Sequence, residues 1–182
     1  MHIVPSHLVL DACCVLNFYA SGQLLPILKS IPVQVTVTQV VREQELTTLQ
    51  RLEGEENDGA TQFEAAISQG LLTIVDFESD EEAELFVNYA AILDDGESAT
   101  GAIAVHRKWA IATDDKKAIS FFRKETPQLQ ILSTLEIVKH WSEEAGVDSQ
   151  TLRDALNLIR VKGKYMPPKS HPLLSWWEAS RK

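Results

Sequence analysis

His7-Leu8-Val9-Leu10-Asp11 (HLVLD) is a short apolar run that ends in an acid. A continuous run of this length is typical of a strand that is buried on both faces, as the strands of parallel sheets are. Similar runs recur along the chain at residues 34–38, 71–75, 110–113 and 129–132. Because helical spacing separates these runs, the sequence predicts an α/β three-layer sandwich around a mostly parallel five-stranded sheet.

The segments between the predicted strands carry the apolar spacing and the capping residues of helices. Ser79 and Glu82 have the spacing of a capping box. The polar segment 53–59 (EGEENDG) is expected to be a loop or a helix break. A first helix is expected over 13–28, with breaks near Gly22 and Pro26, and a second runs from a Thr38 cap through Leu46. Further helices are expected over 63–68, from Ser79 to 94–96, over 97–105 and over 117–124. The chain is expected to be helical from Thr134 onward, with breaks at Gly146 and at 163–168.

Length and cysteine content limit the class of protein. The chain has 182 residues, of which 45% are hydrophobic, and this favours one compact unit with its own core. The only cysteines, Cys13 and Cys14, are adjacent, so they indicate no disulfide framework and favour a reducing compartment. The sequence shows neither a membrane-spanning apolar stretch nor a secretory signal pattern. We therefore expect a cytoplasmic protein without a membrane partner.

The net charge of -9 argues at first against a nucleic-acid partner. The charge is unevenly distributed, however: residues 41–100 hold 16 acids and 2 bases, a net of -14, and residues 101–182 hold 14 bases and 9 acids, a net of +5. A binding face depends on local charge rather than on the total. Nucleic acid therefore stays among the possible partners.

Acidic residues stand at or near the carboxyl ends of the predicted strands. They are Asp11, Glu43, Glu97, Asp114 and Asp115. Because the carboxyl ends of parallel strands carry the ligand crevice of such sheets, we expect these side chains to converge. Two carboxylates about 4 Å apart repel by about 4 kcal/mol at an effective dielectric constant near 20, so the group needs protons or a cation. Oxygen ligands of this kind suit Mg²⁺ or Mn²⁺.

A bound Mg²⁺ or Mn²⁺ ion lowers the pKa of its water and orients it for in-line attack on a phosphodiester. The sequence contains no competing nucleophile motif: it lacks a G-x-S-x-G elbow, a phosphate-binding loop, an H-E-x-x-H helix and zinc-type Cys/His spacing. Metal-assisted hydrolysis of a phosphodiester is therefore the favoured chemistry.

Other interpretations of the same acids remain open. An Asp at a strand end or a Glu in a first helical turn is common for capping reasons alone. Asp94 and Asp95 are interpreted as helix-terminating surface acids, and a further set as a solvated face, namely Glu53, Glu55, Glu56, Glu81 and Glu82. One alternative function is a phosphate-handling enzyme or receiver that uses Asp11 as nucleophile or phosphoacceptor. Another is a non-catalytic interaction module.

Four segments, taken in order, resemble the PIN domain, the nuclease fold of VapC-type toxins. They are Leu8–Ala12, Thr38–Glu43, the stretch 93–104 with its D-x-G-E pattern, and Ile111–Lys116. The resemblance implies a divalent-metal endoribonuclease in which Asp11, Glu43, Glu97 and Asp115 hold the metal. Asp114 competes with Asp115 for the last place, and Thr113 would assist by hydrogen bonding within the site. The resemblance also implies an RNA substrate and a cognate antitoxin protein, as in type II toxin–antitoxin pairs.

The chain departs from this family pattern in two places. Cys13 stands where members commonly carry Ser or Thr, and the chain continues beyond the core. We expect a PIN-like domain over 1–135 and a helical extension over 136–182, packed on or beside it. The extension interleaves bases with aromatic residues, namely Arg153, Arg160, Lys162, Lys164 and Lys169 with Tyr165, Trp176 and Trp177. Such a pattern suits single-stranded RNA, although docking of the tryptophans against the domain or a second subunit, and an antitoxin site, are alternatives.

Overall fold

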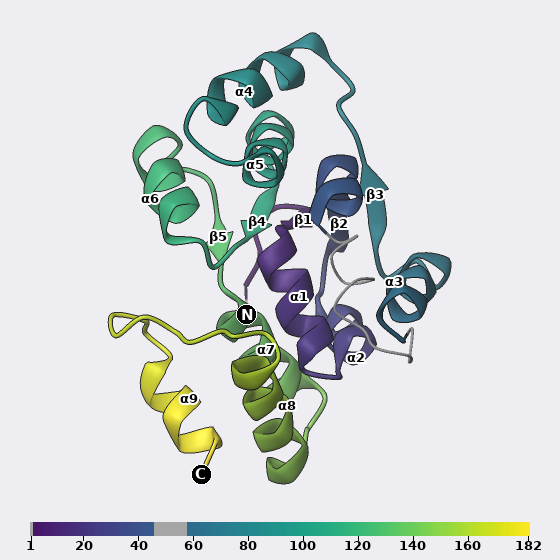
Figure 1. Cartoon of the computed structure of the whole chain (residues 1–182), viewed down its shortest axis with the longest axis vertical. Coiled ribbons are helices and arrows are strands. Elements are labelled where there is room, and N and C mark those ends of the chain that lie inside the picture. Colours follow the sequence, from purple (N-terminus) through teal and green to yellow (C-terminus); the bar gives the residue numbers. More distant parts are fainter. Residues whose placement is uncertain (1, 46–57) are drawn as a thin grey trace.

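Five parallel strands form one sheet in the order β3-β2-β1-β4-β5 (Figure 1). The structure is a computed structural model and describes residues 2–45 and 58–182. The strands are β1 (His7–Leu10), β2 (Gln34–Thr38), β3 (Thr73–Val75), β4 (Ala110–Ala112) and β5 (Ile131–Leu132). The predicted fold is confirmed, and every neighbouring pair of strands is parallel.

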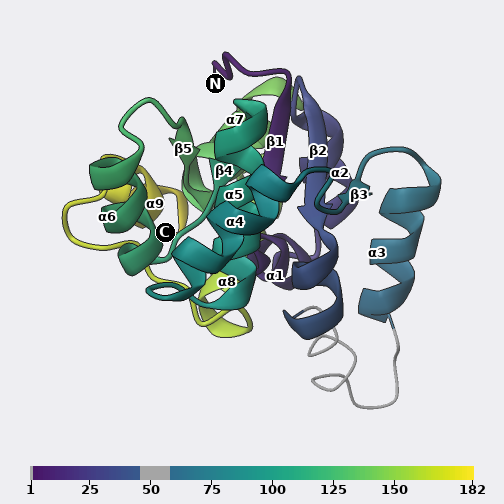
Figure 2. The ribbon, with the colours of Figure 1, turned by 90° about the horizontal axis from the view of Figure 1, so that it is seen from above.

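Helices cover both faces of the sheet. Their bounds are α1 (Ala12–Ala20), α2 (Leu24–Ser30), the π-helix η1 (Val41–Glu45), α3 (Asp58–Ser68), α4 (Asp80–Ala90), α5 (Asp95–Arg107), α6 (Lys116–Glu125), α7 (Thr134–Glu144), α8 (Ser149–Val161) and α9 (Leu174–Ser180). In Figures 1 and 2, α3 lies beside β3 and α6 beside β5, at opposite edges of the sheet. None of the helices in the described ranges is long and apolar enough to cross a membrane.

Alternate residues of the central strands supply two separate cores. Leu8 and Leu10 of β1 belong to the apolar cluster that includes α1, α2, α7 and α8. Val9 of β1 and Ile111 of β4 belong to the cluster on the other face, with α4, α5 and α6. Since all four side chains are fully buried, both faces of the central strands are covered, as the continuous apolar runs predict.

Local signals locate most elements, although several observed element ends differ from the predicted ones. Gly22 follows α1 with a φ of +71°, as expected of a helix break. Pro26, in contrast, does not break α2, because it lies in the first helical turn, where its missing N–H has no partner to lose. The predicted loop 53–59 is partly wrong, since Asp58 already begins α3; its remaining residues, like Leu46, lie outside the described part of the chain.

Glu82 corrects the interpretation of the acidic segment as a solvated face. Its side chain is 2% exposed and accepts hydrogen bonds from Nε of Arg107 at 2.6 Å and from Nη2 at 2.8 Å. The N–H of Glu82 bonds to Ser79, but its carboxylate accepts from the N–H of Glu78 rather than completing a capping box. These bonds, chiefly those from Arg107, lower the pKa of Glu82. The acid therefore ties α4 to the end of α5.

Replacing Glu82 by Gln is expected to lower the free energy of unfolding by about 2 kcal/mol at neutral pH, because it removes one charge of a buried pair. Since the fold lowers the pKa of Glu82, its contribution is present above the unfolded pKa and is lost as the pH falls through the folded pKa. Denaturant unfolding of Glu82→Gln and wild type from pH 7 to 3 should therefore show a shrinking difference. Glu84→Gln, at an exposed position of the same helix, is the control, and an equal difference at both ends of the range would contradict the ion-pair account.

Helices of the C-terminal segment share a core with the sheet. Trp141 of α7 and Trp177 of α9 lie in the same apolar cluster as Leu8. Trp177 is 2% exposed and meets the ring of Tyr165 edge-on at 6.0 Å. Docking is thus the right interpretation of Trp177, because its buried ring has no face left for an RNA base. The division of the chain at residue 135 stays a prediction.

Candidate active site

Asp11 lies where β1 ends and α1 begins. Its side chain is 4% exposed and accepts hydrogen bonds from the N–H of Ala12 at 2.8 Å, from Thr113 Oγ1 at 2.7 Å and from Cys13 Sγ at 3.3 Å. Burial raises the pKa of Asp11 despite these bonds. A buried carboxyl with fixed orientation and a perturbed pKa is typical of a functional site.

Thr113 reaches Asp11 because of the strand register. Leu10 of β1 pairs with Ala112 of β4, so the residues that follow them are neighbours at the carboxyl edge of the sheet. Thr113 is buried, donates to Asp11 and accepts a hydrogen bond from the N–H of Asp115 at 3.2 Å. The expected hydrogen bond within the site is present, and the part of Thr113 in catalysis stays a prediction.

Asp114 and Asp115 are adjacent in sequence but serve different parts of the fold. Asp115 begins α6, where its Oδ1 accepts from the N–H groups of Lys117 at 2.7 Å and Ala118 at 2.9 Å. Asp114 instead accepts from Asn17 Nδ2 at 3.2 Å and from the N–H of Thr134 at 3.1 Å. Burial raises the pKa of Asp114.

Glu97 is the acid whose surroundings are the most negative. It lies in the first turn of α5 and forms a capping box with Asp94, which accepts from the N–H of Glu97 at 2.8 Å. Burial, followed by the charges of Asp94, Asp115 and Asp11, raises the pKa of Glu97 to about 8. Asp115 is thus one of the acids whose charge acts on Glu97. The interpretation of Asp94 and Asp95 as acids that terminate a helix is wrong, because Asp94 is the N-cap of α5 and Asp95 is its first residue.

Glu43, the remaining expected site residue, lies on η1. Its side chain in η1 is exposed and accepts from Gln39 Nε2 at 2.5 Å. Contacts of η1 with α1 and α5 bring this element toward the same end of the sheet. A place for Glu43 in the acid group stays a prediction.

A cavity of about 270 Å³ opens beside the acids, between α1, the loop after β4 and the segment after α8. Its lining includes Asn17, Asp114, Asp115, Lys164 and Tyr165. Sequence reasoning assigned no role to Asn17, although a buried polar residue in an apolar helix is itself a signal. Lys164 has a φ of +52°, in the left-handed region that residues other than glycine seldom adopt.

The chemistry of the carboxylates fits a divalent cation. Asp11, Glu97 and Asp115 offer oxygen ligands, and burial, followed by the charges of neighbouring acids, raises the pKa of Glu97. In the described ranges, the set of three potential ligand atoms within 4.8 Å of one another belongs to Cys13, Cys14 and Asp114, not to these acids. A looser group of carboxylates suits Mg²⁺ or Mn²⁺, since Mg²⁺ usually keeps several waters.

Comparison with known proteins identifies a family match over most of the chain. A family model, PIN domain, matches residues 7–172 and so includes the strands, the acids and most of the C-terminal helices. No match was found among curated proteins.

Proposed function

Because the chain belongs to the PIN domain family, a nuclease fold, we propose that it is a divalent-metal-dependent endoribonuclease that hydrolyses RNA phosphodiester bonds. The proposal is carried by the position of Asp11, which is buried at the end of β1 and held by Thr113 at 2.7 Å, together with the acids around Glu97, which add to burial in raising its pKa. A protein keeps such mutually repelling acids together where a cation or a proton transfer uses them.

In this proposal Asp11, Glu97 and Asp115 hold Mg²⁺ or Mn²⁺ directly or through water, and Glu43 completes the set. The bound ion supplies a water of lowered pKa and stabilises charge on the leaving oxygen. Hydrolysis then needs no covalent intermediate with the protein.

The remaining work of the site is to hold the carboxylates in position. Thr113 fixes one oxygen of Asp11, and the N–H of Asp115 in turn bonds to Thr113. The first turn of α6 fixes Asp115, and the capping box fixes Glu97. Because these partners are backbone groups or a buried hydroxyl, the acids are oriented before substrate binds.

The proposal is tested with labelled single-stranded RNA and purified protein in Mg²⁺, in Mn²⁺ and in a chelator. Glu97→Gln is expected to reduce the metal-dependent cleavage rate by about 100-fold or more, since even partners of metal ligands contribute 10–100-fold. Asp95→Asn is the matched control, because Asp95 is an exposed acid of the same helical turn. Cleavage that survives the chelator, or an equal loss in both variants, would reject the assignment.

We further propose that the enzyme is the toxin of a type II toxin–antitoxin pair. This rests on the likeness of its acid-bearing segments to VapC-type toxins. Expression of the chain alone should arrest bacterial growth, whereas Asp11→Asn should not. Rescue by the product of a small neighbouring gene would identify the antitoxin, and normal growth at a verified expression level would count against a toxin.

A further inference from the structure

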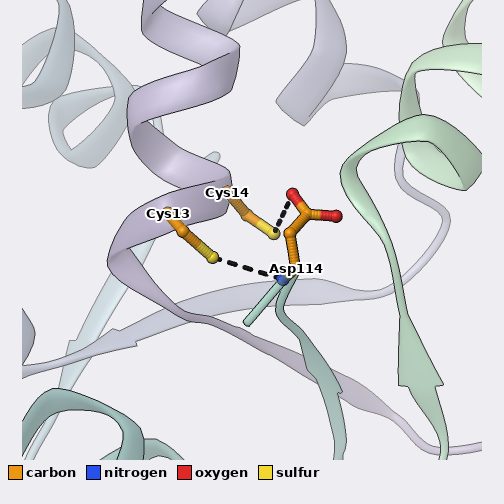
Figure 3. Close-up of side chains that lie close together, drawn as sticks. All are labelled: Cys13, Cys14 and Asp114. Carbon is orange, nitrogen blue, oxygen red and sulfur yellow. Dashed lines mark hydrogen bonds between the residues drawn. The ribbon is translucent and has the colours of Figure 1, made fainter. Parts of the chain in front are cut away.

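Two sulfur atoms and a carboxylate meet between the first turn of α1 and the loop after β4 (Figure 3). One ligand atom each from Cys13, Cys14 and Asp114 lies within 4.8 Å of the other two. We propose that these three side chains form a second cation site, selective for a thiophilic divalent metal such as Zn²⁺ or Cd²⁺. The site adjoins the carboxylate group of Asp11, Glu97 and Asp115, since Cys13 Sγ lies 3.3 Å from Asp11 Oδ2, but its ligands are different side chains and metal binding to them does not require nuclease activity.

The spacing of the ligands suits a tetrahedral ion. Bond lengths of about 2.3 Å to sulfur and about 2.0 Å to oxygen place the two ligand atoms about 3.5 Å apart in tetrahedral geometry. Cys14 Sγ and Asp114 Oδ2 are 3.9 Å apart, so a small movement brings both to bonding distance. Two sulfur ligands favour Zn²⁺ or Cd²⁺ over Mg²⁺, which takes oxygen ligands.

Neighbouring groups already orient each of the three ligands. The N–H of Asp114 donates to Cys13 Sγ at 3.3 Å, and Thr134 Oγ1 donates to Cys14 Sγ at 3.5 Å. Asn17 and the N–H of Thr134 hold the Asp114 carboxylate. Such outer partners are a regular part of metal sites in proteins. The pKa of both thiols is raised, for Cys14 chiefly by burial, so the thiolates form only as the metal binds.

The site has an entrance. Cys14 is fully buried, but Cys13 is half-buried and lines the 270 Å³ cavity together with Asp114. The cavity leaves room for water as the fourth ligand, as in sites with three protein ligands. Binding replaces two thiol protons by one divalent cation, and both protons leave to solvent while Asp114 binds as the carboxylate.

Titration of the reduced, full-length protein with Co²⁺ tests the proposal by spectroscopy, because Co²⁺ reports both tetrahedral geometry and sulfur ligation. We expect one equivalent to give a thiolate-to-cobalt charge-transfer band that Zn²⁺ abolishes and Mg²⁺ does not. Cys13→Ser and Cys14→Ser should lose the band, and Asp114→Asn should weaken binding by about 10-fold or more. Glu97→Gln should retain the band, since it alters only the carboxylate group.

A second measurement needs no variant and so does not depend on the folding of Cys14 substitutions. One equivalent of Zn²⁺ should slow alkylation of the half-buried Cys13 by at least about 10-fold in the folded wild type, as expected when a metal holds the thiolate. Absence of the cobalt band with both thiols verified as reduced, or alkylation unaffected by Zn²⁺, overturns the proposal. A band that survives in either serine variant also overturns it. Loss of RNA cleavage in the nuclease assay affects neither readout.

Discussion

Replacing Asp11 by Asn is expected to abolish metal-dependent RNA cleavage, with a rate at least about 100-fold below wild type. Asp11 lies at the end of the central strand β1, and three neighbouring groups hold its carboxylate in place. Asn keeps the size of the side chain and can still accept from Ala12, but it removes the negative charge that a cation needs. Single-turnover cleavage at saturating Mn²⁺ is the measurement, since it separates chemistry from product release.

The same variant should stay folded and melt at the wild-type temperature or above it. Burial raises the pKa of Asp11, so the charged carboxylate costs stability at neutral pH and Asn removes this cost. Because the folded pKa is raised, the gain should be present at neutral pH, fade as the pH falls from the folded pKa toward the unfolded value of about 3.9, and be absent below it. Asp80→Asn, an exposed acid in the first turn of α4, is the control. Wild-type cleavage by Asp11→Asn would remove Asp11 from the proposed mechanism.

Gly101→Ala is expected to lower the free energy of unfolding by about 2–3 kcal/mol and to slow RNA cleavage. A Cβ at this position would lie 2.1 Å from Cζ of Phe122, whose ring is 1% exposed and packs edge-on against Phe121 and Tyr89. The ring has no room to move aside, so α5 and α6 must separate. Glu97 lies one turn before Gly101 on α5 and would shift with that helix.

Asp115 is the N-cap of the helix that carries Phe122, so the same separation alters the spacing of two proposed metal ligands. A loss of about 10-fold in cleavage rate is reasonable for a displacement of this kind. Replacing Phe122 by the smaller Leu should relieve the clash. The double variant Gly101→Ala/Phe122→Leu should therefore lose less free energy of unfolding than the sum of the losses in the two single variants. Strict additivity in denaturant unfolding would show that the close approach is not the cause.

Sequence patterns predict the fold because the signals that determine it are local. Continuous apolar runs identify the strands, and the acid after the first run becomes Asp11 at the sheet edge. Glu97 is likewise predictable, since it opens a helix beside the same edge. The Thr38 cap is confirmed by the hydrogen bond from the N–H of Val41.

Features that depend on distant partners are not predictable in this way. Glu82 stands in a run of acids and is buried only because Arg107, 25 residues later, pairs with it. Asp114 and Asp115 are both aspartates, and they have different hydrogen-bond partners because groups on other helices, such as Asn17 of α1, bind Asp114. The burial of Trp177 depends on a core built from elements far earlier in the chain.

The opposite orientations of Asp114 and Asp115 limit how the β4–α6 connection can vary in length. Surface loops usually tolerate inserted or deleted residues. Here Thr113, Asp114 and Asp115 bond to different parts of the fold, namely Asp11 at the start of α1, helix α7 and helix α6. Removing or adding one residue would deprive at least one of these parts of its partner. The three-residue connection is therefore expected to keep its length in homologous chains even where the flanking strand and helix diverge.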